Sequence, residues 1–579
     1  MDVVHTLFER RALEAPDSTA LVSGAVLLTY RELDARANGL ARSLLRGGVG
    51  PETPVPLRLD RSPELLVALL AVCKAGGTAV LLDPGWPEDR LAPVLDDCPV
   101  VIDGPLGAAP SNEGPGIPAH PDQLAYAVHT SGSTGRPKLV GVTHRAIAHR
   151  VATHTEAYRI TPADRSSWLA PPASSVSVVE LWPYLCSGAS VHVADPATSG
   201  SPSELRDWMV ASGITRAYVN MPLAEPLYGL PWPAETSLRL MTVGSDAVRV
   251  WPAPDLPFEV AVEYGSAEAN GVTSCLVPLE DRCTSATADE AARRARPPIG
   301  RAWPEVGAGV LTSDLRPVAA GEIGELFVSG PELARGYLGE AAHTAERFLP
   351  DPAGGGGRVY RTGDLVRERP DGRLEHHGRV DAQVKIRGHR VEPAEVEAVL
   401  LRHPGVRECV VTGVPGPDGD LRLCAYVVHP VTPEAGAPSR TADGARFEIG
   451  ELRAFASARL PEPMVPTAWT ALERLPLNAA GKVDRRALPA PSWGEATRGR
   501  ERSADPVTAG VLELWERALG ARGALGDHFI RSGGDSLSAT RLVEAVGNRY
   551  GVRIRLREFL RAPTPETLIQ TIRAEGSTR

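Results

Sequence analysis

Four lysines are the first candidates for chemistry in this chain. Of its 62 lysine and arginine residues, the lysines are Lys74, Lys138, Lys385 and Lys482. A compact ammonium on a flexible stem can meet several oxygens in a small pocket, where a flat guanidinium fork is too wide. A GC-rich genome would explain the scarcity of lysine but not these positions. We therefore expect the lysines to contact oxyanions.

Lys138 closes a loop rich in glycine and hydroxyl residues. The loop follows the apolar run Leu124–Val128 and comprises Thr130, Ser131, Gly132, Ser133, Thr134 and Gly135, with Arg136 and Pro137 before the lysine. Glycines permit a tight turn, so that hydroxyl and backbone N–H groups can wrap a triphosphate. The pattern is neither a Walker loop nor Gly-x-Gly-x-x-Gly, and alone it would most often be only a loop.

The elements expected around these residues define three blocks. Up to residue 380, helical patterns such as Leu65–Lys74 alternate with buried strands such as Gly77–Leu82, which predicts a mostly parallel sheet covered by helices. Residues 381–490 predict an α+β domain. Residues 491–504 form a polar linker, and residues 505–579 show amphipathic helical periodicity.

Composition excludes several classes of protein. The formal net charge of −9, with no basic cluster, argues against general nucleic-acid binding. Charged residues near the N-terminus argue against a signal peptide, and no stretch is apolar enough to span a bilayer. Seven cysteines without a Cys-x-x-Cys pair suggest reduced, mostly buried thiols. We therefore expect a cytoplasmic location.

Motifs along residues 1–490 resemble, in order and spacing, the adenylate-forming superfamily, which includes non-ribosomal peptide synthetase adenylation domains, acyl-CoA synthetases and luciferases. Besides Thr130–Lys138, the matching segments are Leu28–Leu33, Cys73–Pro84, Gly324–Gly330, Ala334–Leu338, Tyr360–Leu365, Gly378–Pro393, Leu460–Pro466 and Gly481–Arg485. The resemblance implies a large N-terminal α/β core and a small, mobile α+β C-terminal subdomain. It also implies that a carboxylic acid reacts with ATP and Mg²⁺ to give an acyl-adenylate.

Roles follow from the resemblance at matching positions. Lys482 would bridge the substrate carboxylate and the nucleotide, Asp364 would accept the ribose hydroxyls with Arg379 nearby, Glu268 would hold Mg²⁺, and Tyr264 would pack on adenine. Positive charge at the reacting phosphorus is what such a reaction requires. Taken alone, Asp364 would be a turn residue and Glu268 a charge at the start of a helix.

Asp381 matches the hinge of the family. The resemblance implies that the smaller domain pivots there and replaces Lys482 with the Lys385–Gly388 loop for attack by a thiol. The alternative for Asp381 is a plain turn residue between domains.

The segment Asp527–Leu537 resembles the phosphopantetheine attachment motif of peptidyl carrier proteins, which are all-α four-helix domains. Ser536 would carry the 4′-phosphopantetheine arm, at the positively polarised start of a helix; Gly-Gly-Asp-Ser could instead be only a helix N-cap. The order of domains predicts an adenylation–carrier didomain of a peptide synthetase. With no condensation domain before it and no thioesterase after it, the chain is expected to load its own carrier for natural-product or antibiotic biosynthesis.

The implied partners are a phosphopantetheinyl transferase and a downstream condensation, tailoring or acyl-transfer enzyme acting in trans. Dependence on a small activator protein of the MbtH type stays open.

The fourth family motif departs from its usual form. Amino-acid-activating domains place an aspartate there for the α-ammonium group, whereas Ser174–Glu180 puts Ser175 at that position, and Arg165–Val179 contains no acidic residue. An ammonium group buried without its charge partner would cost several kcal/mol. The remaining positions that match the family's pocket are Val176, Val179, Leu223, Met241, Val243, Glu263, Gly271 and Val272.

Glu263 and Ser175 are the polar members of this pocket, so a substrate amine or guanidine β or further from the carboxylate is expected to pair with Glu263. A β-amino, ω-amino or aromatic amino acid would fit. Alternatively, Glu263 is satisfied by protein groups or is neutral with a raised pKa, and the substrate is a hydroxy or aryl acid, or an α-amino acid binds differently.

Leu139, Ser266-Ala267 and Ala480 also depart from the residues usual at these positions in the family motifs.

Two further functions stay open for the chain: it could be an acyl-CoA ligase, or a degenerate, non-catalytic adenylation platform.

Overall fold

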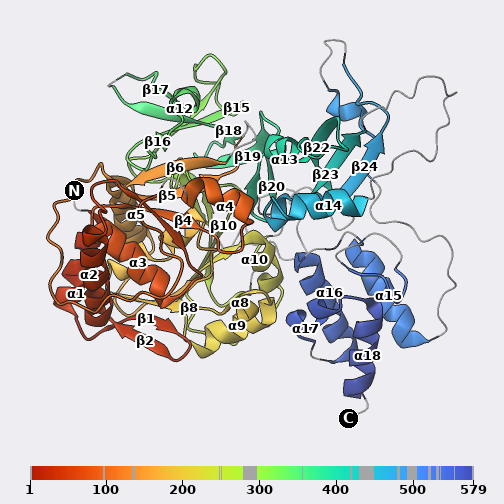
Figure 1. Cartoon of the computed structure of the whole chain (residues 1–579), viewed down its shortest axis with the longest axis horizontal. Coiled ribbons are helices and arrows are strands. Elements are labelled where there is room, and N and C mark those ends of the chain that lie inside the picture. Colours follow the sequence, from red (N-terminus) through yellow and green to blue (C-terminus); the bar gives the residue numbers. More distant parts are fainter. Residues whose placement is uncertain are drawn as a thin grey trace. The chain divides into compact units, whose positions relative to one another are not determined.

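The computed structural model divides the chain into two units, Met1–Thr130 with Pro137–Asp381 and Ser131–Arg136 with Ala382–Arg579. It describes residues 3–95, 98–132, 137–246, 248, 251–253, 255–277, 297–354, 356–416, 420–429, 449–478, 483–491, 505–519, 523–529, 532, 534, 536–552 and 554–576. Each unit is described by itself, with the element labels of Figure 1.

A nine-stranded sheet forms the centre of the first unit, in the order β13-β12-β11-β10-β9-β7-β8-β1-β2. Its strands are β1 (Thr19–Ser23), β2 (Val26–Thr29), β7 (Arg165–Trp168), β8 (Ser190–Val193), β9 (Arg216–Asn220), β10 (Leu240–Gly244), β11 (Glu259–Tyr264), β12 (Thr273–Leu276) and β13 (Arg301–Ala302). All pairs between β1 and β11 are parallel, whereas β2, β12 and β13 add antiparallel edges. Every residue of β8 and β10 is buried, as expected for parallel strands covered on both faces.

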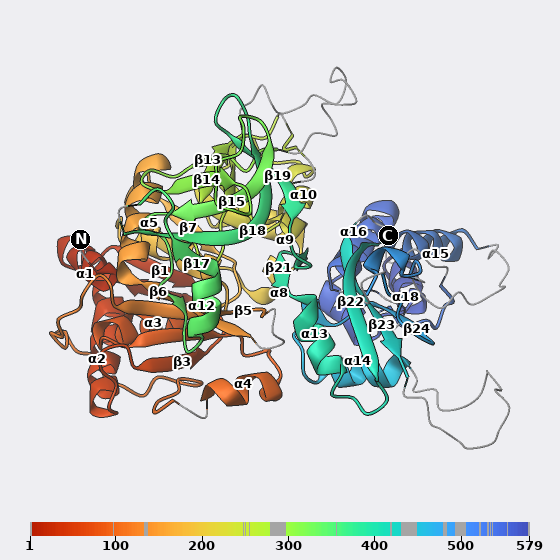
Figure 2. The ribbon, with the colours of Figure 1, turned by 90° about the horizontal axis from the view of Figure 1, so that it is seen from above.

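Helices of this unit pack against its several sheets, as Figures 1 and 2 show. They are α1 (Val4–Glu14), α2 (Tyr30–Arg46), α3 (Pro63–Lys74), α4 (Glu88–Leu95), α5 (His144–Ala157), α6 (Ser175–Val179), α7 (Trp182–Leu185), α8 (Pro196–Ser199), α9 (Pro202–Ala211), α10 (Met221–Tyr228) and α12 (Ala341–Arg347). One apolar cluster includes residues of α5 and α7, and a second includes residues of α9 and α10. The cores therefore lie on two faces of the central sheet.

A second sheet carries the start of the glycine-rich loop. Its strands are β3 (Pro54–Arg58), β4 (Thr78–Leu82), β5 (Leu124–Thr130), β6 (Lys138–Thr143) and β16 (Gly336–Tyr337), in the order β16-β6-β5-β4-β3. β5 and β6 pair in antiparallel register, with Thr130 opposite Lys138. Gly141 lets β16 approach, because a Cβ at this position would lie 2.7 Å from Leu338 Cδ2.

An antiparallel sheet follows, and it differs from the alternating parallel pattern expected up to residue 380. It contains β14 (Gly307–Leu311), β15 (Ile323–Ser329), β17 (Phe348–Pro350), β18 (Arg358–Glu368) and β19 (Leu374–Arg379). β18 and β19 are joined by a tight turn that contains Gly372, with φ of 76°. Antiparallel neighbours need only short connections, so no covering helix is required between these two strands.

The second unit contains an α+β subdomain and a helical domain. The former has β20 (Val384–Ile386), β21 (His389–Val391), α13 (Pro393–Leu400), β22 (Glu408–Pro415), β23 (Leu421–Val428), α14 (Ile449–Ser457), β24 (Ala468–Leu472) and the 3₁₀ turns Glu462–Met464 and Arg485–Ala487. The latter has α15 (Pro506–Leu519), α16 (Ser536–Tyr550), α17 (Leu556–Arg561) and α18 (Pro565–Gly576), packed around one apolar core. The predicted α/β core, α+β subdomain and all-α four-helix domain are confirmed.

Lys74 has a structural environment. Its ammonium group is 1% exposed and pairs with Glu9 and, over 2.9 Å, with Asp34. It joins α3 to α1 and α2, so this lysine contacts carboxylates of the protein rather than the loop that Lys138 closes.

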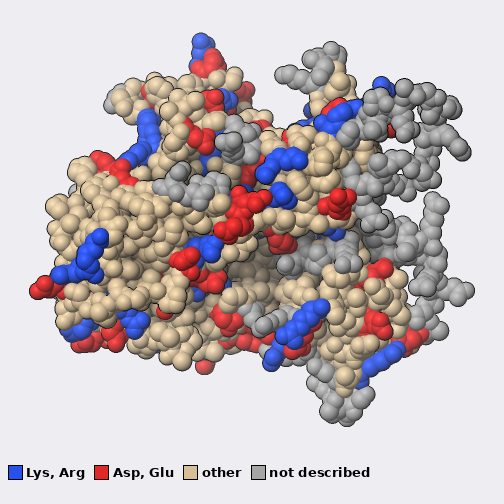
Figure 3. Space-filling model, viewed as in Figure 1, with Lys and Arg blue, Asp and Glu red and all other residues tan. Residues whose placement is uncertain are grey.

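The surface and the helices show two further properties. On the face in Figure 3, lysine and arginine side chains are interspersed with aspartate and glutamate side chains. Within the described residues, none of the helices has the length and apolar character needed to cross a membrane.

Candidate active site

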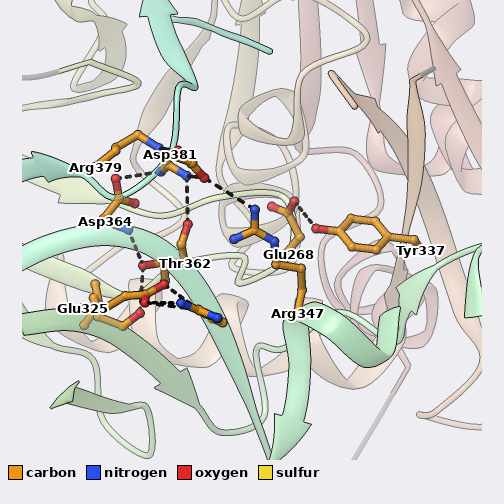
Figure 4. Close-up of polar contacts among 10 residues, drawn as sticks. Glu268, Glu325, Tyr337, Arg347, Thr362, Asp364, Arg379 and Asp381 are labelled. Atoms are coloured by element: carbon orange, nitrogen blue, oxygen red, sulfur yellow. Dashed lines mark hydrogen bonds and ion pairs between the residues drawn. The ribbon is translucent and has the colours of Figure 1, made fainter. Parts of the chain in front are cut away.

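The antiparallel pair β18–β19 places Asp364 opposite Arg379. Arg379 Nη1 donates to Asp364 Oδ1 over 2.7 Å, and His376 Nε2 lies 3.1 Å from the same oxygen. Tyr264, the last residue of β11, donates its hydroxyl to Asp364 Oδ2 over 2.5 Å. Three of the residues expected to bind a nucleotide thus lie together, although they come from two different sheets. Figure 4 shows Asp364 and Arg379 at this point.

Electrostatics fix the role of Tyr264 in this cluster. Burial raises its pKa well above the usual value, and the neighbouring Asp364 carboxylate raises it further. The hydroxyl therefore stays protonated and donates at neutral pH. Its hydrogen bond holds the tyrosine ring beside Asp364, in a position where the ring can offer a flat face to a base and the carboxylate can accept hydroxyl groups.

Asp381 lies on the other side of the same arginine. Arg379 Nε and Nη2 donate to the two Asp381 carboxylate oxygens over 2.7 and 2.9 Å, and Nη2 also donates to the Thr362 carbonyl over 3.0 Å. Arg347 Nη2 lies 3.4 Å from Asp381 Oδ2. Asp381 is also the last residue of the first unit.

Tyr337 links a second pair of expected site residues, Lys138 and Glu268. The Lys138 ammonium lies 5.1 Å from the centre of the Tyr337 ring, and the Tyr337 hydroxyl donates to Glu268 Oε1 over 3.0 Å. Tyr337 reaches both because β16 pairs with β6, which begins at Lys138. Figure 4 shows the Tyr337 ring pointing at the Glu268 carboxylate.

Glu268 and Asp364 do not occupy the plain structural positions that the sequence also allowed. Glu268 lies in an irregular segment between β11 and β12, not at the start of a helix, and its backbone carbonyl accepts from Ala334 N–H over 2.9 Å. Asp364 lies inside β18 rather than in a turn. Both side chains are buried, at 1% and 6% exposure.

The Glu268 carboxylate suits a hard cation. Mg²⁺ uses one or two carboxylates together with water and phosphate oxygens rather than a full protein cage. The described residues contain no group of three or more side chains that could hold a metal by themselves. A single buried carboxylate therefore fits a magnesium ion that accompanies a triphosphate.

The glycine-rich loop is described only in part. Thr130 ends β5, while Ser131 and Gly132 group with the second unit. There the Ser131 hydroxyl donates to the Arg390 carbonyl over 2.9 Å, and the Gly132 N–H donates to Glu395 Oε2 over 3.1 Å. Ser133, Thr134 and Gly135 lie outside the described residues.

Three further residues that the sequence analysis singled out, Lys385, Lys482 and Ser536, belong to the second unit. Lys385 lies in the middle of β20, in a short hairpin whose turn has positive φ at Arg387 and Gly388. Lys482 lies outside the described residues. Ser536 is the first residue of α16, and its side chain lies outside the described part.

The altered fourth motif forms the short helix α6. Ser174 caps it by accepting from the Val176 N–H over 3.2 Å, which places Ser175 at the first helical position. Ser177 accepts from Trp168 Nε1 over 2.8 Å. Glu180 accepts from the N–H groups that follow β7, at Leu169 over 2.9 Å and at Ala170 over 2.8 Å. These contacts fix the register of the motif against β7.

The residues expected to line the acid pocket divide between two faces of the sheet. Met241 and Val243 are fully buried in the cluster shared with α9 and α10, where Leu223 is partly buried. Glu263 follows Val262, a member of that cluster, on β11. Successive side chains of a strand point to opposite faces of the sheet, so Glu263 projects from the other face, toward α5. Ser175, Val176 and Val179 are partly exposed on α6, and Gly271 and Val272 are buried before β12.

Protein groups contact one oxygen of Glu263. Tyr158 donates its hydroxyl to Glu263 Oε1 over 2.5 Å, and His154 Nε2 lies 3.3 Å from that oxygen. Burial acts to raise the pKa of Glu263, but His154, Arg150 and the Tyr158 hydrogen bond outweigh it and the pKa is lowered. The Glu263 side chain is 12% exposed.

Sequence reasoning missed several contacts of this site. Tyr337 stands inside a recognised motif, Ala334–Leu338, but only the pairing of β16 with β6 reveals that it links Lys138 to Glu268. His376 and Arg150 carry no sequence signal, because their partners are 12 and 182 residues away.

Comparisons with known proteins cover most of the chain. The AMP-binding enzyme family matches residues 8–103 and 100–338, the AMP-binding enzyme C-terminal domain matches residues 395–482, and the phosphopantetheine attachment site family matches residues 509–572. Glu268 and Tyr264 lie inside the first match, whereas β18 and β19 lie between the first match and the second.

Two curated relatives are similar along nearly the whole chain. A large component of linear gramicidin synthase from Brevibacillus parabrevis is 38% identical over 578 residues, and phosphinothricin tripeptide synthetase PhsC of Streptomyces viridochromogenes is 37% identical over 606 residues. The matches cover 95% and 99% of this chain, which spans 7% of the first relative and 53% of the second.

A solved structure is similar over nearly the whole chain. It is a holo peptide synthetase protein that contains adenylation and PCP domains and is bound to a vinylsulfonamide inhibitor. The sequences are 25% identical, the TM-score is 0.76, and the match covers 99% of this chain and 96% of that one.

Proposed function

Because the chain belongs to the AMP-binding enzyme family, we propose that it joins a carboxylic acid to ATP and then loads the acyl group onto its own carrier domain. In the first step a substrate carboxylate oxygen attacks the α-phosphorus and pyrophosphate leaves. In the second step a thiol on the carrier attacks the acyl carbon and AMP leaves. The chain would thus act as an AMP-forming acid–carrier-protein ligase.

One observation carries this proposal. Arg379 and Tyr264 both contact Asp364, and Lys138 approaches Glu268 through Tyr337. These groups come from motifs spread over 242 residues (138 to 379), and two anionic reactants need such a combination of cations, acceptors and a metal-binding carboxylate. Lys482 would complete the first step, and Lys385 would take its place for the second after rotation at Asp381.

Two bound groups would supply the remaining chemistry. Mg²⁺ would neutralise phosphate charge beside Glu268, and 4′-phosphopantetheine on Ser536 would supply a thiol on a flexible arm. A phosphopantetheinyl transferase would attach that arm, and a condensation, tailoring or acyl-transfer enzyme would take the product. An MbtH-like protein is an additional partner to test.

We propose that the substrate is a β-amino, ω-amino or aromatic amino acid. Ser175 offers no charge for an α-ammonium group, and Glu263 is the acidic residue among the expected pocket positions. Tyr158 and His154 contact Oε1 of that carboxylate. The Arg150 guanidinium that acts on Glu263 is shared with the carboxylate of Glu332, so a substrate cation would add a further positive charge beside these two carboxylates.

Loading of the holo protein tests both the proposed enzyme class and the proposed substrate class. The protein is converted by a phosphopantetheinyl transferase and incubated with ATP, Mg²⁺ and α-amino, β-amino, ω-amino, aryl and hydroxy acids, and the mass of the carrier is read by intact-protein mass spectrometry. We expect a mass gain that requires Ser536 and occurs with β-, ω- or aromatic amino acids. Glu263→Gln should lower this loading by about 100-fold, because a charged pair is lost. Glu259→Gln, an exposed change on the same strand, is the matched control.

Other outcomes identify the alternatives. Loading of hydroxy or aryl acids that Glu263→Gln leaves unchanged would contradict the amine proposal and keep the enzyme class. Acyl-CoA formation without modification of Ser536 would indicate an acyl-CoA ligase, and no ATP consumption with any acid would indicate a non-catalytic platform.

A further inference from the structure

Arg150 is a charged residue in the interior of the first unit. It lies on α5, is 2% exposed, and belongs to the largest fully buried side chains of the described residues. Burying a guanidinium is costly unless it is paired and hydrogen-bonded. The surrounding residues must therefore supply a countercharge and hydrogen-bond partners for the guanidinium.

Glu332 supplies the countercharge. Arg150 Nη2 donates to Glu332 Oε2 over 2.5 Å, and His149 Nδ1 lies 2.9 Å from Glu332 Oε1. Glu332 is also only 2% exposed, so the pair is shielded from water on both sides. The guanidinium carbon lies 5.2 Å from the centre of the Trp303 ring, which adds a favourable cation–π contact.

The same guanidinium reaches the surroundings of Glu263. Arg150 Nη1 lies 3.0 Å from His154 Nε2, the nitrogen that also lies 3.3 Å from Glu263 Oε1. One ring nitrogen cannot accept from Arg150 and donate to Glu263 at the same time. Arg150 and Glu263 therefore compete for Nε2 of His154. The hydrogen bond from the Tyr158 hydroxyl to Glu263 Oε1 forms whichever of the two His154 binds.

Gly271 connects Arg150 with the acid pocket. A Cβ placed on Gly271 would lie 0.8 Å from Arg150 Nη2 and 1.8 Å from Cζ. A side chain at this position and the guanidinium therefore exclude each other. The arginine reaches the position from α5 and fills the volume that a residue larger than glycine would take.

We propose that Arg150, held by Glu332, is a specificity-determining residue that closes the acid pocket at Gly271 and limits the length of the acid. This inference rests on the proposed function, because it needs an acid bound beside Glu263 and Gly271. Removing the guanidinium should extend the pocket at Gly271 by the volume of that group.

A length series of acids tests the inference. Homologous acids of increasing chain length, from the class that the wild-type protein loads, are compared by kcat/KM for loading of the holo protein. Arg150→Met with Glu332→Leu removes both charges together, which avoids an unpaired buried carboxylate. Arg145→Met is the matched control, since Arg145 lies on the same helix and pairs with Asp122 at the surface.

We expect the double variant to change the kcat/KM ratio of the longer to the shorter acid by at least about tenfold, chiefly through KM for the acid, with KM for ATP unchanged. A ratio that stays within about twofold of wild type, with all acids affected equally, would overturn the inference and leave Arg150 a purely structural role. The comparison uses whichever acids the wild type loads, so a failure of the amine proposal would appear in the wild-type panel alone.

A second variant keeps the test decisive should the double variant not fold. Gly271→Ala alone should abolish loading, because its Cβ would overlap Arg150 Nη2. Adding Arg150→Ala should restore loading of short acids to at least a tenth of the wild-type rate. Equal loss in the single and combined variants, with thermal unfolding unchanged, would contradict a shared volume at this position.

Discussion

At the scale of single residues, one hydrogen bond joins two segments of the site. Tyr264 and Asp364 are 100 residues apart, and the tyrosine hydroxyl donates to the carboxylate over 2.5 Å. Arg379 and His376 approach the other oxygen of Asp364. The acceptor expected for the ribose is thus oriented by three side chains, and the tyrosine ring is oriented by the acceptor.

Tyr264→Phe removes this hydroxyl and keeps the ring. A hydrogen bond to a charged group contributes roughly 1.5–3 kcal/mol, so we expect KM for ATP to rise about 10- to 100-fold. ATP–pyrophosphate exchange measures the change. Tyr126→Phe, which loses a buried hydroxyl bonded to Asn270 over 3.3 Å, is the control and should leave KM for ATP within about threefold. A similar KM in wild type and Tyr264→Phe would contradict the role of this hydrogen bond.

At the scale of elements, the short helix α6 depends on contacts outside itself. Helices of five residues are not stable alone. Ser174 caps the helix, Ser177 accepts from Trp168, and Glu180 satisfies two backbone N–H groups after β7. These three contacts hold Ser175 at the start of the helix.

Glu180 makes this anchorage sensitive to pH. Burial raises its pKa to about 8, and the N–H groups of Ala170 and Leu169 and the charge of Arg61 only partly oppose that effect. Between about pH 4.5 and pH 8 the unfolded chain therefore carries the charge while the folded protein holds the proton. The wild type should lose up to about 1.4 kcal/mol of stability per pH unit relative to Glu180→Gln across this range.

Unfolding of both proteins at pH 5, 6, 7 and 8 measures this difference. We expect the stability of Glu180→Gln relative to wild type to increase steadily with pH. A difference that is constant from pH 5 to pH 8 would mean that Glu180 is ionised in the folded protein.

At the scale of the whole molecule, the boundary between the units falls directly after Asp381. Arg379 and Arg347 hold this residue on the side of the first unit. Lys385 lies four residues beyond it on β20. A rotation at this boundary would move Lys385 and Lys482 together while leaving Asp364 and Tyr264 in the first unit.

Three lysine variants should separate the two steps of the reaction. Lys482→Ala should abolish ATP–pyrophosphate exchange. Lys385→Ala should retain exchange within about fivefold but slow loading of Ser536 by at least tenfold, because only the second step is impaired. Lys74→Met should lower the melting temperature without separating the steps, since Lys74 pairs with Glu9 and Asp34 inside the first unit. Persistence of exchange in Lys482→Ala would contradict the role assigned to that lysine.

The sequence by itself determined the family, the order of the domains and most of the buried strands, because motif spacing and apolar runs are local properties. Asp364, Glu268 and Lys138 could be singled out because each stands in such a motif. The antiparallel sheet of β14, β15, β17, β18 and β19 was not predicted, since these strands lack the helix–strand alternation that identified the central sheet.

Only the tertiary structure decided which of these residues meet. The pairing of β16 with β6 brings Tyr337 between Lys138 and Glu268, and β11 carries Glu263 on the face opposite Met241 and Val243. Burial, long-range strand pairing and the volume of Arg150 above Gly271 depend on residues far apart along the chain, so no local pattern could reveal them.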